Sequence, residues 1–184
     1  MNTDDIINSI MIGRYARNFV VPNYTPKGWW ECDVFELTRA GYFREYEVKV
    51  TRGDFFADSH KSKTDWDAYA KTRSERLAAG GNDVTLPSEC VMNKHASVAK
   101  GLSKGPCQFW YVTPRDLVTV DEVPEWAGLI YITKNYTELS IKAAPKLHNV
   151  KADTTIVAHA KGVCYWRFHN LRAKEFKSKR LAKL

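Results

Sequence analysis

Two runs of strand-forming residues, 29–38 and 42–50, flank the tripeptide Arg39-Ala40-Gly41 and constrain the fold more than any other part of this 184-residue sequence. A three-residue hairpin loop commonly combines a type I turn with a third residue in the left-handed region, where glycine fits best. Gly41 occupies that third position. The sequence therefore predicts an antiparallel hairpin centred on Ala40, in which residues whose numbers sum to 80 face each other.

This register decides which side chains of the hairpin share a face. It places Asp33 opposite Glu47, and strand side chains alternate between the two faces of a sheet. A loop one residue longer or shorter would move these two carboxylates to opposite faces. One face is then expected to carry Glu31, Asp33, Glu45, Glu47 and Lys49. The other face is expected to carry residues that suit a core, namely Cys32, Val34, Tyr46, Val48 and Val50.

Two carboxylates that face each other across a hairpin repel and would normally destabilise it. A cation between Asp33 and Glu47 removes this conflict, and oxygen atoms are the ligands that Mg²⁺ requires. The carbonyl of Val48 is a further candidate ligand. Lys49 can reach a water or phosphate oxygen beside the metal, where a phosphodiester transition state builds negative charge. The alternative interpretation is structural, because alternating Glu and Lys also keep a solvent-facing strand soluble.

The segment ECDVFEL-TRAG-YFREYEVKVTRGDFFAD, residues 31–58, resembles the core of the PD-(D/E)XK nuclease superfamily. In that superfamily an aspartate on one strand and an E-x-K on the next strand, ahead of a helix, build the metal site. Asp33 matches the aspartate, Glu47 the second acid and Lys49 the lysine. The resemblance implies a restriction-endonuclease-like core and a deoxyribonuclease that depends on Mg²⁺ or Mn²⁺.

The longer pattern E-x-K-V-[ST]-R-x-D-F-x-x-D is similar to a subgroup of small bacterial and phage proteins with this fold. It implies an additional part of the site on the helix after the second strand, formed by Asp54, Asp58 and Lys61. The alternative for the two aspartates is an N-cap and a surface acid. The resemblance covers roughly residues 20–150, through later segments such as Lys94-His95, with residues 62–90 as an insertion.

One departure from the superfamily concerns the first helix. Many members carry a glutamate there as an extra metal ligand, and residues 4–18 contain none. Asp4, Asp5 or Glu31 are the candidates to replace it.

The rest of the sequence predicts one α/β domain over residues 1–184, with a mixed central sheet flanked by helices. Apolar spacing near 3.6 residues predicts the first helix, with Thr3 or Asp4 as its N-cap. The tryptophans are expected mostly in the core. The expected elements are helices at 4–18, about 53–77, within 90–104 and from Asp153, strands at 108–113, 127–133 and 139–144, and a loop at 20–28.

The C-terminal end concentrates the positive charge. From Lys161 onward there are eight basic residues and one acid, Glu175, which accounts for the whole net charge of +7. Such a concentration favours a polyanion as partner. The alternative is a solvated helix end without a partner. If DNA is bound, the expected contacts on the basic C-terminal helix or tail, 161–184, are Lys174, Lys177, Lys179 and Arg180.

Other features exclude several classes of protein. The four cysteines occur singly, without the C-x-x-C spacing of a zinc or redox site, and the five histidines show no metal-ligand spacing. His95 is expected at the surface. The first residues are acidic where a signal peptide is basic, and no segment approaches the roughly 18 apolar residues of a membrane span. We therefore expect a cytoplasmic protein without a membrane partner, located in the host cytoplasm if a phage encodes it.

These observations predict a metal-dependent endonuclease or exonuclease that acts on DNA. Two alternatives belong to other classes: a nucleic-acid-binding module that kept the fold but lost cleavage, and a phage interaction protein. Metal-dependent nicking separates the first prediction from both alternatives.

Overall fold

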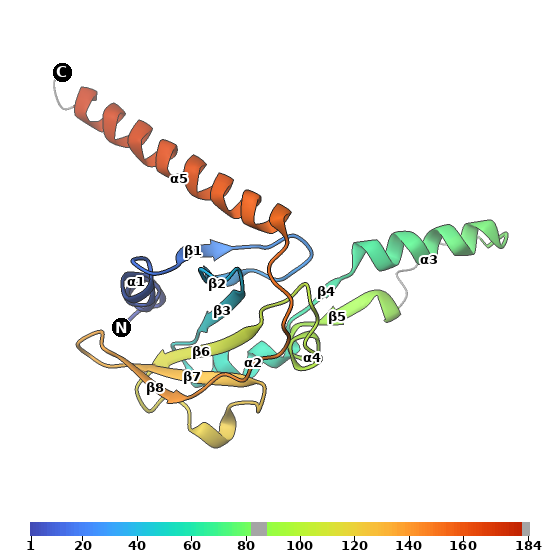
Figure 1. The fold of residues 1–184 in the computed structure, drawn as a ribbon, viewed down its shortest axis with the longest axis horizontal. Coiled ribbons are helices and arrows are strands. Elements are labelled where there is room, and N and C mark those ends of the chain that lie inside the picture. The colour runs from blue at the N-terminus through green and yellow to red at the C-terminus, as the bar shows by residue number, and fades with distance from the viewer. Residues whose placement is uncertain (82–87, 182–184) are drawn as a thin grey trace.

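The centre of the fold is a mixed sheet whose neighbouring strands are β1 (Phe19–Tyr24), β2 (Cys32–Leu37), β3 (Phe43–Val48), β6 (Gln108–Pro114), β7 (Ala127–Ile132) and β8 (Glu138–Lys142) (Figure 1). Strands β3, β6 and β7 run parallel to one another, and the other neighbouring pairs are antiparallel. The computed structural model describes residues 1–81 and 88–181. It confirms the predicted α/β fold with a mixed central sheet, and helices lie on both sides of that sheet.

The β2–β3 hairpin has the predicted register. Phe35 pairs with Glu45, and the remaining pairs also sum to 80. Gly41 has a φ of 87°, and its N–H donates to the carbonyl of Thr38 at 2.8 Å. The N–H of Thr38 in turn donates to the carbonyl of Tyr42 at 2.9 Å. The loop is therefore the type I turn followed by a left-handed glycine that the sequence predicts.

Helix α1 (Thr3–Arg14) covers one face of the sheet. Its N-cap is Asn2, which exchanges hydrogen bonds with Asp5, so the prediction of Thr3 or Asp4 is wrong by one or two residues. The helix buries Ile6, Ile7 and Ile10 in a cluster with Val34, Tyr46 and Val48. These three hairpin residues therefore face a core, as predicted.

The opposite face of the sheet is covered by α2 (Arg52–Ala57) and α4 (Lys94–Ala99). Phe55 and Val98 from these helices join the larger core, which includes Phe35 and Phe109 of the sheet. Cys32 also belongs to this core and lies on the Glu45 side, so its predicted position on the α1 side is wrong. The short helix expected within residues 90–104 is α4.

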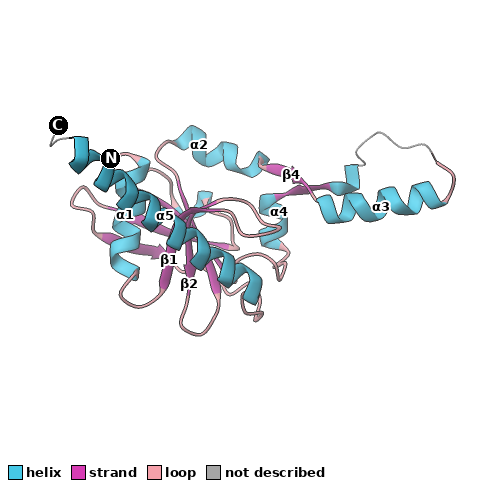
Figure 2. Cartoon of the chain, turned by 90° about the horizontal axis from the view of Figure 1, so that it is seen from above, coloured by secondary structure: helices cyan, strands magenta, loops and turns pink. Residues whose placement is uncertain are grey.

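The helix predicted over residues 53–77 is interrupted. Helix α2 ends in a 3-10 helix (Asp58–His60), and a short strand, β4 (Ser62–Thr64), pairs with β5 (Val91–Asn93). Asp65 then caps a separate helix, α3 (Trp66–Ala78), which projects from the main body (Figure 2). Two further 3-10 helices span Ser88–Cys90 and Val120–Glu122.

The predicted loop at residues 20–28 is mostly the edge strand β1. Pro22 is compatible with a strand there because, within the described residues, β1 pairs only with β2, and an edge position tolerates a missing N–H donor.

The long helix α5 (Thr154–Leu181) begins against β1 and then leaves the body of the protein (Figure 1). Ile156 and Ala160 are buried, whereas every residue from 165 to 179 is exposed. Trp166 is 66% exposed and is therefore an exception to the expectation that the tryptophans lie mostly in the core; Phe168 is 58% exposed. None of the helices in the described part of the chain is long and apolar enough to cross a membrane.

Candidate active site

Charged side chains from separate segments meet between the sheet and the helices α2 and α4. We call this set the charged cluster: Asp33, Glu45, Glu47, Lys49, Asp58, Lys61 and Lys94. Burying charges costs free energy unless each is paired with good geometry. Five members are no more than 3% exposed: Glu45, Glu47, Lys49, Asp58 and Lys94.

Glu47 lies at the centre of the charged cluster. Its Oε1 accepts hydrogen bonds from Lys49 at 2.9 Å and from Lys61, and its Oε2 accepts one from Lys94 at 2.6 Å. Burial acts to raise the pKa of Glu47, but the three ammonium groups outweigh burial and lower it. Glu47 is therefore a carboxylate whose two oxygens are both occupied by lysines.

Lys94 is fully buried and connects two glutamates. Its Nζ lies 2.7 Å from Glu45 Oε1 and 2.6 Å from Glu47 Oε2, and the other oxygen of Glu45 accepts a hydrogen bond from Trp29 Nε1 at 2.7 Å. Burial would lower the pKa of Lys94, but the two carboxylates raise it well above its ordinary value. Lys94 is therefore charged and holds the two acids of β3 together.

Asp58 organises the other side of the charged cluster. Its Oδ1 lies 2.8 Å from both Lys49 Nζ and Lys61 Nζ. Its Oδ2 accepts a hydrogen bond from Tyr111 at 2.9 Å and lies 2.9 Å from His95 Nε2. Burial opposes the charge of Asp58, but His95 and the lysines lower its pKa. His95 is only 16% exposed at its side chain, so the prediction of a surface histidine is wrong.

The charged cluster contains four acids but only three lysines, and Asp33 is the acid that remains to be described. Its Oδ2 accepts a hydrogen bond from the N–H of Val48 at 2.7 Å, and no described residue donates a hydrogen bond to Oδ1. Burial and the nearby charge of Glu47 raise the pKa of Asp33 to about 6. Burial contributes more to this rise than the like charge of Glu47 does.

The donor set can be tested against a divalent cation. Among residues 1–81 and 88–181, no group of three or more His, Cys, Asp or Glu side chains is arranged to hold a metal ion. Asp33 is nevertheless suited to bind a divalent cation. No described residue donates a hydrogen bond to one of its carboxylate oxygens, and the acids around it outnumber the lysines. Glu47 fits only if a lysine moves aside. Lys61 is 41% exposed and can do so, whereas Lys49 and Lys94 are 3% and 0% exposed.

The remaining predicted site residues lie at the margin of the charged cluster or outside it. Asp54 is 53% exposed and 3.9 Å from Lys49, so it lies at the edge. Glu31 is exposed and makes no ion pair with any described residue. Asp5 is engaged in the cap of α1, and Asp4 is exposed beside it. Lys174, Lys177 and Lys179 are exposed on α5, and the side chain of Arg180 lies outside the described residues.

Four residues that contact the acids of the site were not predicted as members: Lys94, His95, Tyr111 and Trp29. Apart from the family resemblance of the segment Lys94-His95, their sequence context gives no signal of their role, because a lysine at the start of a short helix is usually exposed and the two aromatics resemble core residues. Their position depends on how α4, β6 and the segment before β2 pack around β3.

No family model matches the sequence, and no curated protein matches it. Among solved structures, the fold is similar to that of SPO1766, a protein of unknown function from Silicibacter pomeroyi. The two share 15% sequence identity with a TM-score of 0.60, over 95% of this chain and 94% of that chain. The similarity therefore extends over nearly the whole of both proteins and, at this identity, shows a shared fold alone.

Proposed function

We propose that the protein is a metal-dependent nuclease that hydrolyses DNA phosphodiester bonds at the charged cluster. The observation that carries this proposal is the meeting of Asp33, Glu47 and Lys49 in one site, where Asp33 has a raised pKa and one oxygen to which no described residue donates a hydrogen bond. The resemblance of residues 31–58 to PD-(D/E)XK nucleases supports the same assignment.

In this proposal Asp33 and Glu47 hold Mg²⁺ or Mn²⁺, with the Val48 carbonyl as a further ligand. The metal would supply a Lewis acid and a water of lowered pKa. Lys49 provides a fixed positive charge, because Glu47 and Asp58 hold its Nζ at 2.9 and 2.8 Å. A preorganised charge of this kind stabilises negative charge that develops on a phosphoryl oxygen.

Asp58 and its partners act as positioning residues. Tyr111 and His95 hold one oxygen of Asp58, while the other oxygen contacts Lys49 and Lys61. Burial and Asp58 raise the pKa of Tyr111, so Tyr111 keeps its proton and donates it in this hydrogen bond. Asp58 is thereby oriented toward the two lysines rather than toward solvent.

Helix α5 supplies the features of a nucleic-acid contact. Basic side chains at Lys174 and Lys177 are exposed there, together with aromatic rings at Tyr165, Trp166 and Phe168. Basic groups pair with phosphates, and exposed rings stack on unpaired bases. The one acid after residue 160, Glu175, is bridged by Arg172 at 3.3 Å and Lys179 at 2.8 Å.

The proposal is tested by incubating the protein with single-stranded, double-stranded and branched DNA, with Mg²⁺, with Mn²⁺ and with a chelator. Cleavage of at least one substrate in the presence of metal, and of none with the chelator, is expected. A Glu47→Gln variant purified in the same way controls for contaminating nuclease. Intact DNA under all metal conditions would refute the proposal.

A second candidate function, DNA binding without cleavage, is favoured by the lysines around Glu47. Because Lys49, Lys61 and Lys94 already neutralise this carboxylate, the folded protein needs no metal to relieve its charge. This candidate predicts salt-sensitive DNA binding, no cleavage, and no rise in the melting temperature on adding Mn²⁺, since only a ligand of the native state stabilises it.

A further inference from the structure

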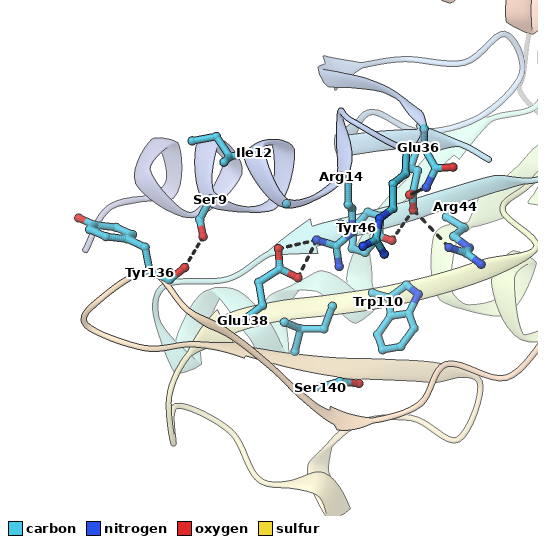
Figure 3. Close-up of a pocket in the computed structure, with 14 residues that line it drawn as sticks. Ser9, Ile12, Arg14, Glu36, Arg44, Tyr46, Trp110, Tyr136, Glu138 and Ser140 are labelled. Atoms are coloured by element: carbon cyan, nitrogen blue, oxygen red, sulfur yellow. Dashed lines mark hydrogen bonds and ion pairs between the residues drawn. The ribbon is translucent and has the colours of Figure 1, made fainter. Parts of the chain in front are cut away.

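A second cavity lies on the α1 side of the sheet, on the face opposite the charged cluster. Its volume is about 710 Å³, within the range of small-molecule sites. It is bounded by α1, the β2–β3 hairpin and the segment that joins β7 to β8 (Figure 3). Ile12 and Tyr136 at its rim are 70% and 48% exposed, so the cavity is open to solvent.

Two residues that line this cavity each carry a buried N–H group for which the described part of the chain offers no acceptor. These groups are Nε of Arg44 and Nε1 of Trp110. Arg44 and Trp110 lie on the neighbouring strands β3 and β6, and Figure 3 draws both among the residues that line the cavity, together with Glu36 and Tyr46. An unmatched buried donor is costly, and each such group in a native protein calls for a partner.

The position of the Trp110 indole is fixed by the strand beside it. Trp110 pairs with Gly128 of β7, and a Cβ at Gly128 would collide with the indole ring. On the other side the ring is nearly parallel to that of Tyr46, at an interplanar angle of 13°. The Nε1 donor is therefore held in place and cannot easily turn to another acceptor.

The acids of the cavity already have donors of their own. Glu138 accepts two hydrogen bonds from Arg14, at 2.5 and 2.7 Å. Glu36 accepts from Tyr46 at 2.5 Å and from Asn18, while Arg44 lies 3.6 Å from it. The cavity also contains Arg17, so three arginines face two acids and the net charge of the lining is positive.

We propose that this cavity binds a small molecule that carries an oxyanion, a phosphate or a carboxylate, next to a flat apolar group. The oxyanion accepts hydrogen bonds from Arg44 Nε and Trp110 Nε1, the two donors that lack acceptors. The apolar group lies along Trp110 and Ile130, which belong to the apolar part of the lining. The site is separate from the charged cluster and does not depend on the nuclease proposal.

Calorimetric titration of the full chain with four probes tests this proposal. Phenyl phosphate and benzoate combine a ring with a phosphate or a carboxylate, inorganic phosphate has no ring, and benzyl alcohol has no charge. At least one of the first two should bind, and at least tenfold more tightly than benzyl alcohol. Comparison of phenyl phosphate with benzoate identifies the oxyanion. Failure of both to bind, or equal binding of benzyl alcohol, would overturn the proposal.

Variants locate the binding. Trp110→Phe keeps a ring over Gly128 but removes the donor, and should weaken binding by about two- to tenfold, the effect of one neutral hydrogen bond. Arg44→Gln should weaken it about tenfold or more, because a charged donor is lost. Arg73→Gln, the same change at an exposed position of α3, is the control and should bind like the wild type. If Arg44→Gln fails to fold, the test depends on Trp110→Phe alone. Wild-type affinity of Trp110→Phe for the phosphate or carboxylate probe would refute the proposed site.

Discussion

Replacing Asp33 with asparagine should stabilise the metal-free protein at pH 8, although the same change is expected to abolish cleavage. Asp33 is the fourth carboxyl group beside three lysines, and its pKa is raised from the ordinary 3.8 to about 6 by burial and by Glu47. A rise of about two pH units corresponds to about 3 kcal/mol, at about 1.4 kcal/mol for each unit. Asparagine removes this cost and still offers an oxygen to the N–H of Val48.

The sign of the effect follows from proton binding. Between the unfolded pKa near 3.8 and the folded pKa near 6, the native state binds the Asp33 proton more strongly than the unfolded state does. The contribution of the Asp33 carboxyl group to the free energy of unfolding of the wild type is therefore fully present below about pH 4 and is lost as the pH rises through 6. The stability difference between Asp33→Asn and wild type should be small near pH 4 and reach about 2–3 kcal/mol above pH 7.

Urea unfolding of both proteins across pH 4–8, in the presence of a chelator, measures this difference. Asp54→Asn is the matched control, because its side chain is 53% exposed at the edge of the same cluster, and it should change stability by no more than about 0.5 kcal/mol. Excess Mn²⁺ should then stabilise the wild type but not Asp33→Asn. An asparagine variant that is less stable than wild type at pH 8, or a difference independent of pH, would refute the electrostatic reasoning.

Three further predictions concern the lysines and α5. Lys49→Ala should lower the cleavage rate on the order of 10²–10³-fold while Mn²⁺ binding, measured by calorimetry, persists; a near-normal rate would leave Lys49 a structural role only. Lys61→Ala should tighten Mn²⁺ binding, because it removes one of the two lysines that contact Oε1 of Glu47 and leaves only Lys49 there; an unchanged or weaker affinity would contradict this. Deleting residues 173–184 should leave the fold intact, since the described side chains there are exposed, and should flatten the log–log salt dependence of duplex binding by about 0.9 for each lost phosphate contact. An unchanged slope would show that this part of α5 does not contact DNA.

The hairpin could be predicted because its determinants are local. Gly41 sets the turn, the turn sets the register, and the register brings Asp33 and Glu47 to one face. Even here the ladder ends at the pair Val34–Tyr46, and the Asp33 side chain accepts a hydrogen bond from the N–H of Val48 that the register alone does not predict. The alternation of strand residues predicts a face, but it does not predict the hydrogen bond that a side chain makes on it.

The rest of the site depends on tertiary contacts that no local pattern encodes. Residues 53–77 do form helices at both ends of this range, but the first helix ends at Ala57. Asp58 and Lys61 follow it and join the charged cluster. Lys94 would be exposed on an isolated helix and is buried only because Glu45 and Glu47 lie next to it. Trp166 shows the opposite case, since tryptophans are expected mostly in the core and this one lies exposed on a projecting helix.

The central claim, that Asp33 and Glu47 form a catalytic metal site, is tested most directly by single-turnover cleavage with excess protein in saturating Mn²⁺. The substrate is the DNA on which wild type is most active, and Asp116→Asn, the same change at a side chain that is 76% exposed outside the charged cluster, serves as the control that should retain activity. Asp33→Asn and Glu47→Gln, each shown to be folded by circular dichroism, should cut no faster than a protein-free sample. Cleavage by both variants at the wild-type rate would contradict the assignment of this site.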